Sequence, residues 1–284
     1  MTKYTDANGN STAFTYDAMN RVTTKTDPLL GVETYQYDVA SQLAQVVDRK
    51  GQLTNLTYDA LNRRTTIVFG DTANHPTSFD STITYSFDAG DRMLQIADSQ
   101  NGTIVRTYDL LDRLTQEQTV QGTISYTYDV AGRRQTRTVS GGTSVAYTFD
   151  AANRLLQLQQ GTQNVSFAYD SSNQRTQTTL PNGVAINYTF DGAGQVTAIS
   201  YAKGASALGN LTFTYDLDGR RSGLGGSFAR TNIPLPVAST TYNRGSQLTQ
   251  WASQALAYDA DGNLISDGLY TYVWNSRNQL VSVT

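Results

Sequence analysis

An aromatic residue followed by aspartate or asparagine recurs thirteen times along the 284-residue chain, and this recurrence limits the possible folds more than any other feature. Seven of the twelve spacings between successive aromatics are 20 or 21 residues. Self-similarity at a fixed period is the signature of a repeat array, which grows by stacking one unit on the next. We therefore expect residues 1–284 to form a single array of about thirteen repeats.

Each repeat contributes an aromatic, in most repeats the aspartate after it and, in many, a glycine or arginine four or five residues on. The predicted structural motif residues are Tyr16, Asp17, Arg21, Tyr37, Asp38, Tyr58, Asp59, Arg63, Phe87, Asp88, Tyr108, Asp109, Arg113, Tyr128, Asp129, Gly132, Arg133, Phe149, Asp150, Arg154, Tyr169, Asp170, Phe190, Asp191, Tyr215, Asp216, Gly219, Arg220, Tyr242, Tyr258, Asp259 and Trp274.

The residues after each aromatic have the composition of a hairpin turn. The fourth residue on is glycine, asparagine or aspartate in eleven of thirteen repeats, and these residues tolerate the positive φ that a type I turn with a bulge requires. The aspartate can accept hydrogen bonds from backbone N–H groups further along the turn. Before the aromatic the chain alternates as a half-buried strand does, for example over residues 124–128. A second glycine cluster, as at Gly51 and Gly122, closes each repeat, so each unit is strand, turn, strand, turn.

The fifth residue after each aromatic is arginine, glutamine or asparagine in every repeat. This regularity predicts a polar bridge to the motif aspartate or to the carbonyls of a neighbouring hairpin, although a solvated strand residue would satisfy the same pattern.

Apolar residues of the returning strand occur both six and nine positions after the aromatic, as at Leu43 and Val46. Strict alternation cannot place both on one face, so either a bulge intervenes or both faces are partly covered.

A hairpin of some 20 residues cannot bury enough apolar surface to be stable alone. We expect neighbouring hairpins to stack aromatic on aromatic across a shared sheet. The predicted fold class is all-β, an array of antiparallel β-hairpins forming one long sheet that curls because strand twist accumulates. No segment has an apolar stripe at helical spacing.

Composition excludes several functions. Charged residues are 16% of the chain, the net charge is −3, and no basic run exceeds a pair such as Arg63-Arg64, so nucleic acid is not an expected partner. There is no cysteine for disulfides or thiolate metal sites. No apolar stretch approaches the roughly 18 residues that a membrane span needs. The first ten residues show no secretory signal, and we interpret the chain as a fragment of a longer protein.

Three longer spacings predict loop insertions near residues 70–80, 201–210 and 222–240. The first holds the one histidine, His75, which has no nucleophile or orienting acid beside it in sequence and is interpreted as a surface residue. The last holds Ile233-Pro234-Leu235-Pro236, which we interpret as a plain loop, with a plug of the concave face or a partner contact as the alternative.

Two other patterns suggest chemistry but have simpler explanations. Residues 6–10 and 259–263 are oxygen-rich like calcium loops, yet both lack the glutamate that an EF-hand loop requires and both lie where a turn belongs. Paired aspartates for glycoside hydrolysis are conceivable, but turn chemistry explains an aspartate in every repeat. We therefore expect no enzyme activity, no cofactor and no metal.

The Tyr-Asp-x-x-Gly/Asn-Arg unit, with glycine between units, resembles the YD or Rhs repeat over residues 4–283, most typically over 259–283. Proteins of this family include the bacterial Rhs polymorphic toxins, the B and C components of insecticidal toxin complexes, and the teneurins. The resemblance implies part of a hollow β-shell that encloses a toxin or, in teneurins, belongs to an adhesion ectodomain. It also implies a secreted or cell-surface location. The family's Asp-Pro-x-Gly-Leu cleavage segment has no counterpart after Leu280, and residues 27–31 resemble it only superficially.

The leading functional hypothesis is a non-catalytic, encapsulating wall segment of an exported toxin or surface protein. Its partners would be the rest of its own full-length chain, either cargo or shell-closing segments. The alternative is a carbohydrate- or receptor-binding adhesion module, because tyrosine, asparagine, glutamine and aspartate are abundant.

Overall fold

The computed structural model describes residues 2–72, 79–230 and 239–284. Contacts between Cα atoms divide the chain into two compact units. Unit 1 combines Met1–Val105 with Leu235–Thr284, and unit 2 is Arg106–Pro234. The described residues contain strands and turns and no helix, so the predicted all-β class is confirmed, and within them nothing has the form of a membrane-spanning helix.

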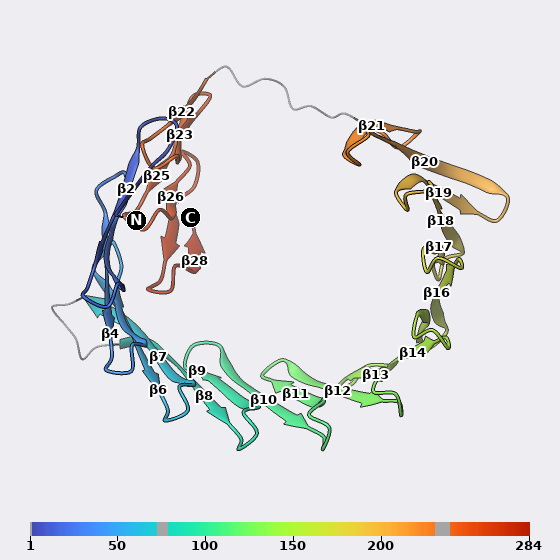
Figure 1. Cartoon of the computed structure of the whole chain (residues 1–284), viewed down its shortest axis with the longest axis horizontal. Coiled ribbons are helices and arrows are strands. Elements are labelled where there is room, and N and C mark those ends of the chain that lie inside the picture. Colours follow the sequence, from blue (N-terminus) through green and yellow to red (C-terminus); the bar gives the residue numbers. More distant parts are fainter. Residues whose placement is uncertain (1, 73–78, 231–238) are drawn as a thin grey trace. The chain divides into compact units, whose positions relative to one another are not determined.

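The strands of unit 1 come from both ends of the chain (Figure 1). They are β1 (Lys3–Thr5), β2 (Ser11–Tyr16), β3 (Val22–Thr26), β4 (Val32–Tyr37), β5 (Leu43–Val47), β6 (Gln52–Tyr58), β7 (Arg64–Thr72), β8 (Phe79–Phe87), β9 (Met93–Asp98), β22 (Thr240–Tyr242), β23 (Leu248–Trp251), β24 (Gln254–Ala255), β25 (Ala257–Tyr258), β26 (Leu264–Ser266), β27 (Tyr272–Trp274) and β28 (Leu280–Val283). Strand β10 (Gly102–Tyr108) crosses the boundary between the units.

Unit 2 is one continuous stretch of chain. Its strands are β11 (Leu114–Thr119), β12 (Gly122–Tyr128), β13 (Arg134–Val139), β14 (Val145–Phe149), β15 (Leu155–Gln160), β16 (Gln163–Tyr169), β17 (Arg175–Thr179), β18 (Val184–Phe190), β19 (Val196–Lys203), β20 (Ser206–Tyr215) and β21 (Arg221–Gly225).

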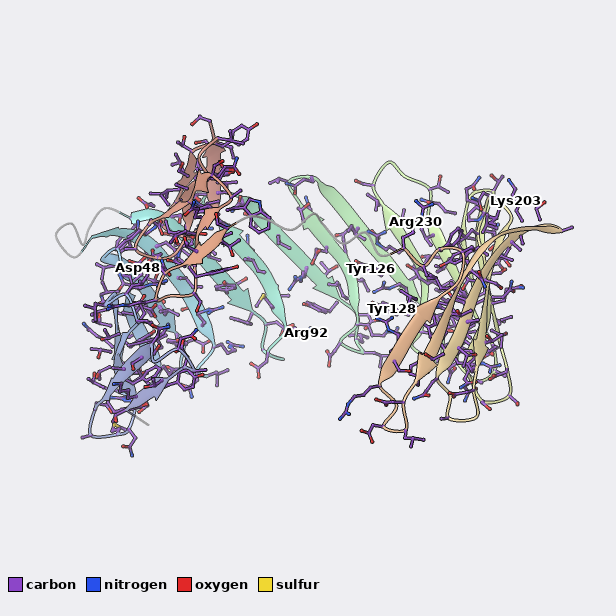
Figure 2. All side chains as sticks on the ribbon, turned by 90° about the horizontal axis from the view of Figure 1, so that it is seen from above. Asp48, Arg92, Tyr126, Tyr128, Lys203 and Arg230 are labelled. Carbon is purple, nitrogen blue, oxygen red and sulfur yellow. The ribbon has the colours of Figure 1, made fainter. Side chains whose placement is uncertain are left out.

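Within each sheet, strands next to one another in sequence pair antiparallel, for example β12 with β13, as expected for an array of hairpins. Strands β1–β21 belong to one sheet, and β22–β24, β25–β26 and β27–β28 form three small ones. Side chains extend from both faces of the strands (Figure 2). Burial is shallow: the most buried apolar side chains described, Leu53 and Ile67, are still 7% and 8% exposed. Because the described residues form no thick core, each hairpin depends on contacts with its neighbours.

Each repeat turns at the predicted position. The fourth residue after the motif aromatic has positive φ in all thirteen repeats, from 56° at Asn278 to 91° at Gly262. The turn closes with paired backbone hydrogen bonds, as in Asp129 N–H to the Arg133 carbonyl at 2.9 Å and Gly132 N–H to the Asp129 carbonyl at 2.9 Å.

A bulge settles the question left open for the returning strand. Tyr128 pairs with Arg134, whereas Thr127 pairs with Thr136, so Gln135 is the extra residue of the bulge. The same register shift occurs next to the motif aromatic in other hairpins, for example at Tyr37 and Tyr169. The shift places the sixth and ninth residues after the aromatic on the same face as the aromatic.

Residues 201–210 differ from the loop that the spacing predicted. They extend strands β19 and β20 into a longer hairpin, in which Lys203 pairs with Ser206. In the 222–240 region, β21 continues to Gly225, and the following turn packs Phe228 against Tyr201 with ring centroids 5.4 Å apart. Residue His75 and the segment 233–236 lie outside the described residues.

Candidate functional site: the motif turns and an ionic cluster

The turn from the motif aspartate to the fifth residue after the aromatic, here called the motif turn, is held by one carboxylate. In the turn Asp129–Arg133, Oδ1 of Asp129 accepts the N–H groups of Ala131 at 3.0 Å and Arg133 at 2.9 Å. Its Oδ2 accepts Nε of Arg133 at 2.7 Å. The same carboxylate–guanidinium pair joins Asp17 to Arg21, Asp59 to Arg63, Asp88 to Arg92, Asp109 to Arg113 and Asp150 to Arg154.

These hydrogen bonds explain why the acidic residue stays ionised. The backbone N–H and then the side chain of Arg154 lower the pKa of Asp150, because both donate to the charged form of the carboxylate. An ionised aspartate committed to its own turn in this way is poorly placed to act as an acid, a base or a metal ligand. The arrangement favours a structural role for the motif aspartates.

The arginine of one motif turn also reaches the next repeat. Nη1 of Arg133 donates to the Asp150 carbonyl at 3.2 Å and to Oδ1 of Asn153 at 2.8 Å. Its guanidinium lies 4.9 Å from the ring centroid of Phe149, a cation–π contact. Equivalent stacking joins Arg21 to Tyr37, Arg63 to Phe87, Arg113 to Tyr128 and Arg154 to Tyr169 at 4.6 to 4.9 Å.

The sequence predicted a polar bridge from the fifth residue and aromatic stacking between repeats. The arginine makes both of the bridges considered, to its own aspartate and to the carbonyl of the neighbouring hairpin. Direct stacking of aromatic on aromatic between repeats was the wrong expectation for these repeats, because a guanidinium lies against the motif ring instead. The guanidinium group fits there because it is planar and charged: it can donate hydrogen bonds to backbone carbonyls and stack on the ring face at the same time.

Not every repeat carries the full bridge. Gln42 and Gln195 reach the next repeat through single amide contacts, to the Asn62 carbonyl at 3.3 Å and the Gly219 carbonyl at 3.4 Å. Arg220 instead pairs with Asp218 at 2.8 Å within its own turn, and its side chain is 77% exposed. Residues Asp38, Asp170, Asp191 and Asp216 keep the backbone contacts of the turn.

A second link between repeats runs through the tip of the motif aromatic. The hydroxyl of Tyr128 donates to the Leu114 carbonyl of the preceding repeat at 2.7 Å. The equivalent bond joins Tyr37 to Val22, Tyr58 to Leu43, Tyr169 to Leu155, Tyr215 to Val196, Tyr258 to Leu248 and, through the indole N–H, Trp274 to Leu264.

This bond was not among the predictions from sequence, although the sequence holds a signal for it. The acceptor is always the sixth residue after the preceding aromatic. Where that residue is an arginine, the next motif aromatic is phenylalanine in three of four cases. The three pairs are Arg64 with Phe87, Arg134 with Phe149 and Arg175 with Phe190.

Within unit 1, the repeats of residues 239–284 pack against those of residues 2–105 (Figure 1). The contact centres on Arg49, whose side chain is 22% exposed. Its Nη1 lies 2.7 Å from Oδ2 of Asp27, and its Nη2 donates to the Asp261 carbonyl. Lys50 adds ion pairs to Asp259 and Asp261, each at 3.2 Å. Together with Asp48 these residues form what we call the ionic cluster.

Burial raises the pKa of Asp48 to about 6, and the neighbouring Asp261 carboxylate adds to the shift. The carboxylates of Asp259 and Asp261, which lie in one of the calcium-like segments, face the ammonium group of Lys50. No group of three or more acidic, histidine or cysteine side chains suited to a metal is found among the residues described. Within this segment, Oδ1 of Asp259 accepts the N–H of Asn263 at 2.8 Å and its carbonyl accepts the N–H of Gly262 at 3.1 Å, which are the bonds of a turn.

Arg277 makes a separate contact. Its Nη1 and Nη2 bind Asp98 at 2.7 and 2.9 Å, and its Nε donates to Oγ of Ser81 at 2.7 Å. Its guanidinium lies 4.8 Å from the Phe69 ring centroid. The side chain is 6% exposed, and the pair with Arg277 holds the pKa of Asp98 well below its usual range.

These contacts follow one rule. The third residue after the motif aromatic in three successive repeats, Gly245, Asp261 and Arg277, packs against a turn between repeats in residues 2–105. A Cβ on Gly245 would lie 3.1 Å from Cδ1 of Leu29, while Asp261 meets Arg49, and Arg277 meets Asp98. The turns concerned, residues 27–31, 48–52 and 98–102, connect one repeat to the next and are here called inter-repeat turns. The motif turns of residues 239–284 thus pack one by one against the inter-repeat turns of residues 2–105.

Comparison with known proteins identifies the family. The model of the teneurin YD-shell family matches residues 80–208 and 185–284, well over half of the chain, and the RHS repeat model matches residues 1–32 and 37–73. The chain therefore belongs to the YD-shell family, and the predicted resemblance is confirmed.

Curated and solved relatives each match only part of their own length. The tRNA nuclease WapA of Bacillus subtilis strain 168 is 32% identical over 77 residues, 26% of this chain and 3% of that protein. A tRNA3(Ser)-specific nuclease WapA of Bacillus spizizenii is 35% identical over 48 residues, 17% of this chain and 2% of that protein.

The crystal structure of TcdB2-TccC3-TEV is similar over 99% of this chain and 21% of that one, with a TM-score of 0.65 and 14% identity. The Photorhabdus luminescens Tc holotoxin pore is similar over 98% of this chain and 19% of that one, with a TM-score of 0.53 and 15% identity. At such identities these likenesses support the fold.

Proposed function

We propose that this chain is a non-catalytic wall segment of an exported YD-shell protein. The observation that carries the proposal is the packing of motif turns against inter-repeat turns. The residues in contact are more than 170 positions apart in sequence, as are Arg277 and Asp98. Such contacts fix one row of hairpins against another and so can build a wall wider than one row. The membership of the YD-shell family supports a shell-forming role.

The proposed partner is the remainder of the full-length chain, including any cargo that the wall encloses. Solved relatives described as a Tc holotoxin pore and as TcdB2-TccC3 support this assignment by analogy. We further propose a secreted or cell-surface location for the parent protein, as expected of toxin and adhesion proteins of this family. The turn carboxylates are already bonded within their turns, which supports a structural and not a catalytic role.

Protease protection of the parent protein tests the wall role. The parent gene product would be digested with a non-specific protease, and its fragments identified by mass spectrometry. We expect the sequence flanking the array to be protected in the wild type and digested in Arg277→Ala, which weakens the packing of the motif turns. Arg220→Ala, at an exposed arginine of unit 2, is the matched control. Equal digestion of the flanking sequence in all three proteins would exclude encapsulation.

The second candidate is an adhesion module. It is favoured by large tyrosines on the surface of unit 1, with Tyr4, Tyr242 and Tyr270 more than half exposed. A screen against a glycan array at physiological salt separates the two roles. Reproducible binding that is lost on mutation of an exposed tyrosine supports adhesion, and absence of binding favours the wall role alone.

A further inference from the structure

The strands of unit 2 from β12 to β21 carry cationic side chains and no acidic ones. Their sequences contain no aspartate or glutamate, and the acidic residues of this stretch lie between the strands. The cations in these strands are Arg134, Arg137, Arg175, Lys203 and Arg221. The arginines of the motif turns have carboxylate partners, as Arg133 has in Asp129, but among the described residues none of the strand cations does.

Three of these cations lie on the face of the sheet that carries the motif aromatics. Residues directly opposite one another in an antiparallel pair share a face. Arg134 is opposite the motif aromatic Tyr128, whose strand is seen in Figure 2. Arg175 and Arg221 occupy the same position in later hairpins, each opposite the motif aromatic of its own hairpin. The positive charge is therefore repeated along one face.

Each of the three guanidinium groups stacks on rings that precede the motif aromatics by two residues. The guanidinium of Arg134 lies 4.6 Å from the ring centroid of Tyr126 in its own hairpin and 5.9 Å from that of Tyr147 in the next. The equivalent distances are 5.8 and 5.0 Å at Arg175 and 5.7 Å, to one ring, at Arg221. Stacking on a ring fixes the plane of a guanidinium group.

The N–H groups of these arginines remain available to a partner. All three side chains belong to exposed residues. Among the described residues they make one hydrogen bond, from Nη2 of Arg175 to the hydroxyl of Tyr188 at 3.5 Å. The N–H groups of a guanidinium lie in its plane, and two of them can bind one carboxylate through parallel hydrogen bonds.

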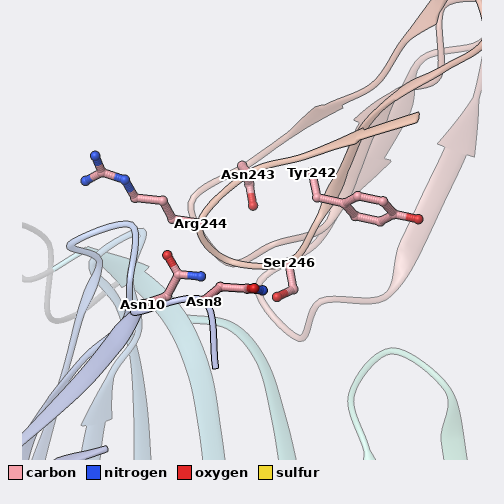
Figure 3. Close-up of a pocket in the computed structure, with 6 residues that line it drawn as sticks. All are labelled: Asn8, Asn10, Tyr242, Asn243, Arg244 and Ser246. Carbon is pink, nitrogen blue, oxygen red and sulfur yellow. The ribbon is translucent and has the colours of Figure 1, made fainter. Parts of the chain in front are cut away.

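An exposed arginine of unit 1 shows what the flanking rings add. Arg244 lies in the motif turn 242–246, and its side chain points away from the ring of Tyr242 (Figure 3). That guanidinium is not held against the neighbouring ring, so its position must be fixed when a partner binds. In unit 2 the rings already hold the guanidinium groups, and less conformational entropy is lost on binding.

The sixth position after the motif aromatic forms a regular strip across the sheet of unit 2. In the hairpins from β12–β13 to β20–β21 it holds in turn Arg134, Leu155, Arg175, Val196 and Arg221. A cation thus alternates with an apolar side chain. Each hairpin adds two strands at about 4.8 Å each, so neighbouring positions of the strip are about 10 Å apart and its arginines about 19 Å apart.

This spacing narrows the class of partner. A small anion reaches only one of the arginines, so a partner that uses all three is a polymer. A nucleic acid carries a phosphate on every nucleotide and is matched by a denser row of cations. A polyproline II helix has three residues per turn and rises about 3.1 Å per residue, so side chains three residues apart lie on one edge at about 9 Å. Surfaces lined with aromatic rings bind such helices in other proteins.

We propose that the ring-bearing face of unit 2 binds an acidic polypeptide segment in the polyproline II conformation. Acidic side chains six residues apart in the segment pair with Arg134, Arg175 and Arg221. The residues midway between them pack on Leu155 and Val196. The row packing in unit 1 uses turns and not this face, so the proposal does not rest on the wall role.

Fluorescence anisotropy with a labelled synthetic peptide tests the proposal. The peptide carries three glutamates six residues apart, with leucine midway between them and proline elsewhere. A peptide of the same composition with its glutamates consecutive is the control ligand. The variants are Arg175→Gln and Arg175→Lys, with Arg220→Gln in a motif turn of unit 2 as the matched control. Melting temperature and circular dichroism confirm that each variant folds.

We expect the wild type and Arg220→Gln to bind the spaced peptide alike and the control peptide more weakly. Affinity for the spaced peptide should fall about tenfold in Arg175→Gln, the loss that one charge-assisted contact predicts. It should fall less in Arg175→Lys, which keeps the charge but not the planar group.

Four results would overturn the proposal. They are no binding of the spaced peptide at low salt, equal binding of the two peptides, an equal loss in Arg220→Gln and Arg175→Gln, and tighter binding of a single-stranded oligothymidine than of the spaced peptide. The last would assign the face to nucleic acid. None of these outcomes would affect the protease test of the wall role.

Discussion

Removing Arg277 should release the last repeats from the first ones while leaving unit 2 folded. The guanidinium is 6% exposed and holds Asp98, itself 15% exposed, through two hydrogen bonds of 2.7 and 2.9 Å. Arg277→Ala leaves the Asp98 carboxylate poorly solvated and without its cation. Breaking a buried pair on one side costs about 3 to 5 kcal/mol.

The lower end of that range applies here. Asp98 keeps hydrogen bonds from Asn101 and from the N–H of Gln100, both at 2.9 Å, so it is not left bare. A cost of about 3 kcal/mol corresponds to a shift of roughly 100-fold between the docked and undocked states. Arg277→Lys should fall between the wild type and Arg277→Ala, because it keeps the charge but not the paired geometry.

Hydrogen exchange followed by mass spectrometry measures this shift directly. Peptides from β27 and β28 should exchange faster in Arg277→Ala, whereas peptides from β12 and β13 in unit 2 provide an unchanged internal reference. Adding Asp98→Ala to the variant should recover part of the loss, because the unpaired carboxylate is then gone. Unchanged exchange in β27 and β28, or fully additive losses in the double variant, would refute the reasoning.

Three further changes test other parts of the structure. Tyr128→Phe removes the hydroxyl bond to the Leu114 carbonyl and should cost about 0.5 to 1.5 kcal/mol in urea unfolding; no loss would mean that the bond does not couple the repeats. The raised pKa of Asp48 means that the folded state binds a proton more tightly than the unfolded state, so stability should increase by about 1 kcal/mol, allowing for solvent screening, as pH falls from 7.5 to 5. Asp48→Asn should make the unfolding free energy of unit 1 nearly independent of pH in that window, and an unchanged slope would contradict the assignment. Gly209→Ala places a Cβ 2.3 Å from the Phe228 ring and should lower stability by about 1 to 3 kcal/mol in thermal unfolding, an effect that Phe228→Ala should relieve.

Local chemistry alone determined much of this protein. The acidic residue after each aromatic and the turn-forming residue three positions later fix a tight turn whatever lies around it, because their hydrogen bonds and backbone angles span only five residues. This is why the hairpins, their antiparallel order and the bridging arginine could be predicted. The family resemblance rests on the same local pattern.

Contacts between repeats were decided by the tertiary structure. Alternation could not locate the bulge at Gln135, because a bulge adds one residue without changing the composition of the strand. The ring–guanidinium contact of Arg133 with Phe149 depends on where the next hairpin lies, which a single repeat does not specify. The pairing of Arg277 with Asp98 joins residues 179 positions apart, and no sequence period connects them, since only packing brings those two edges together.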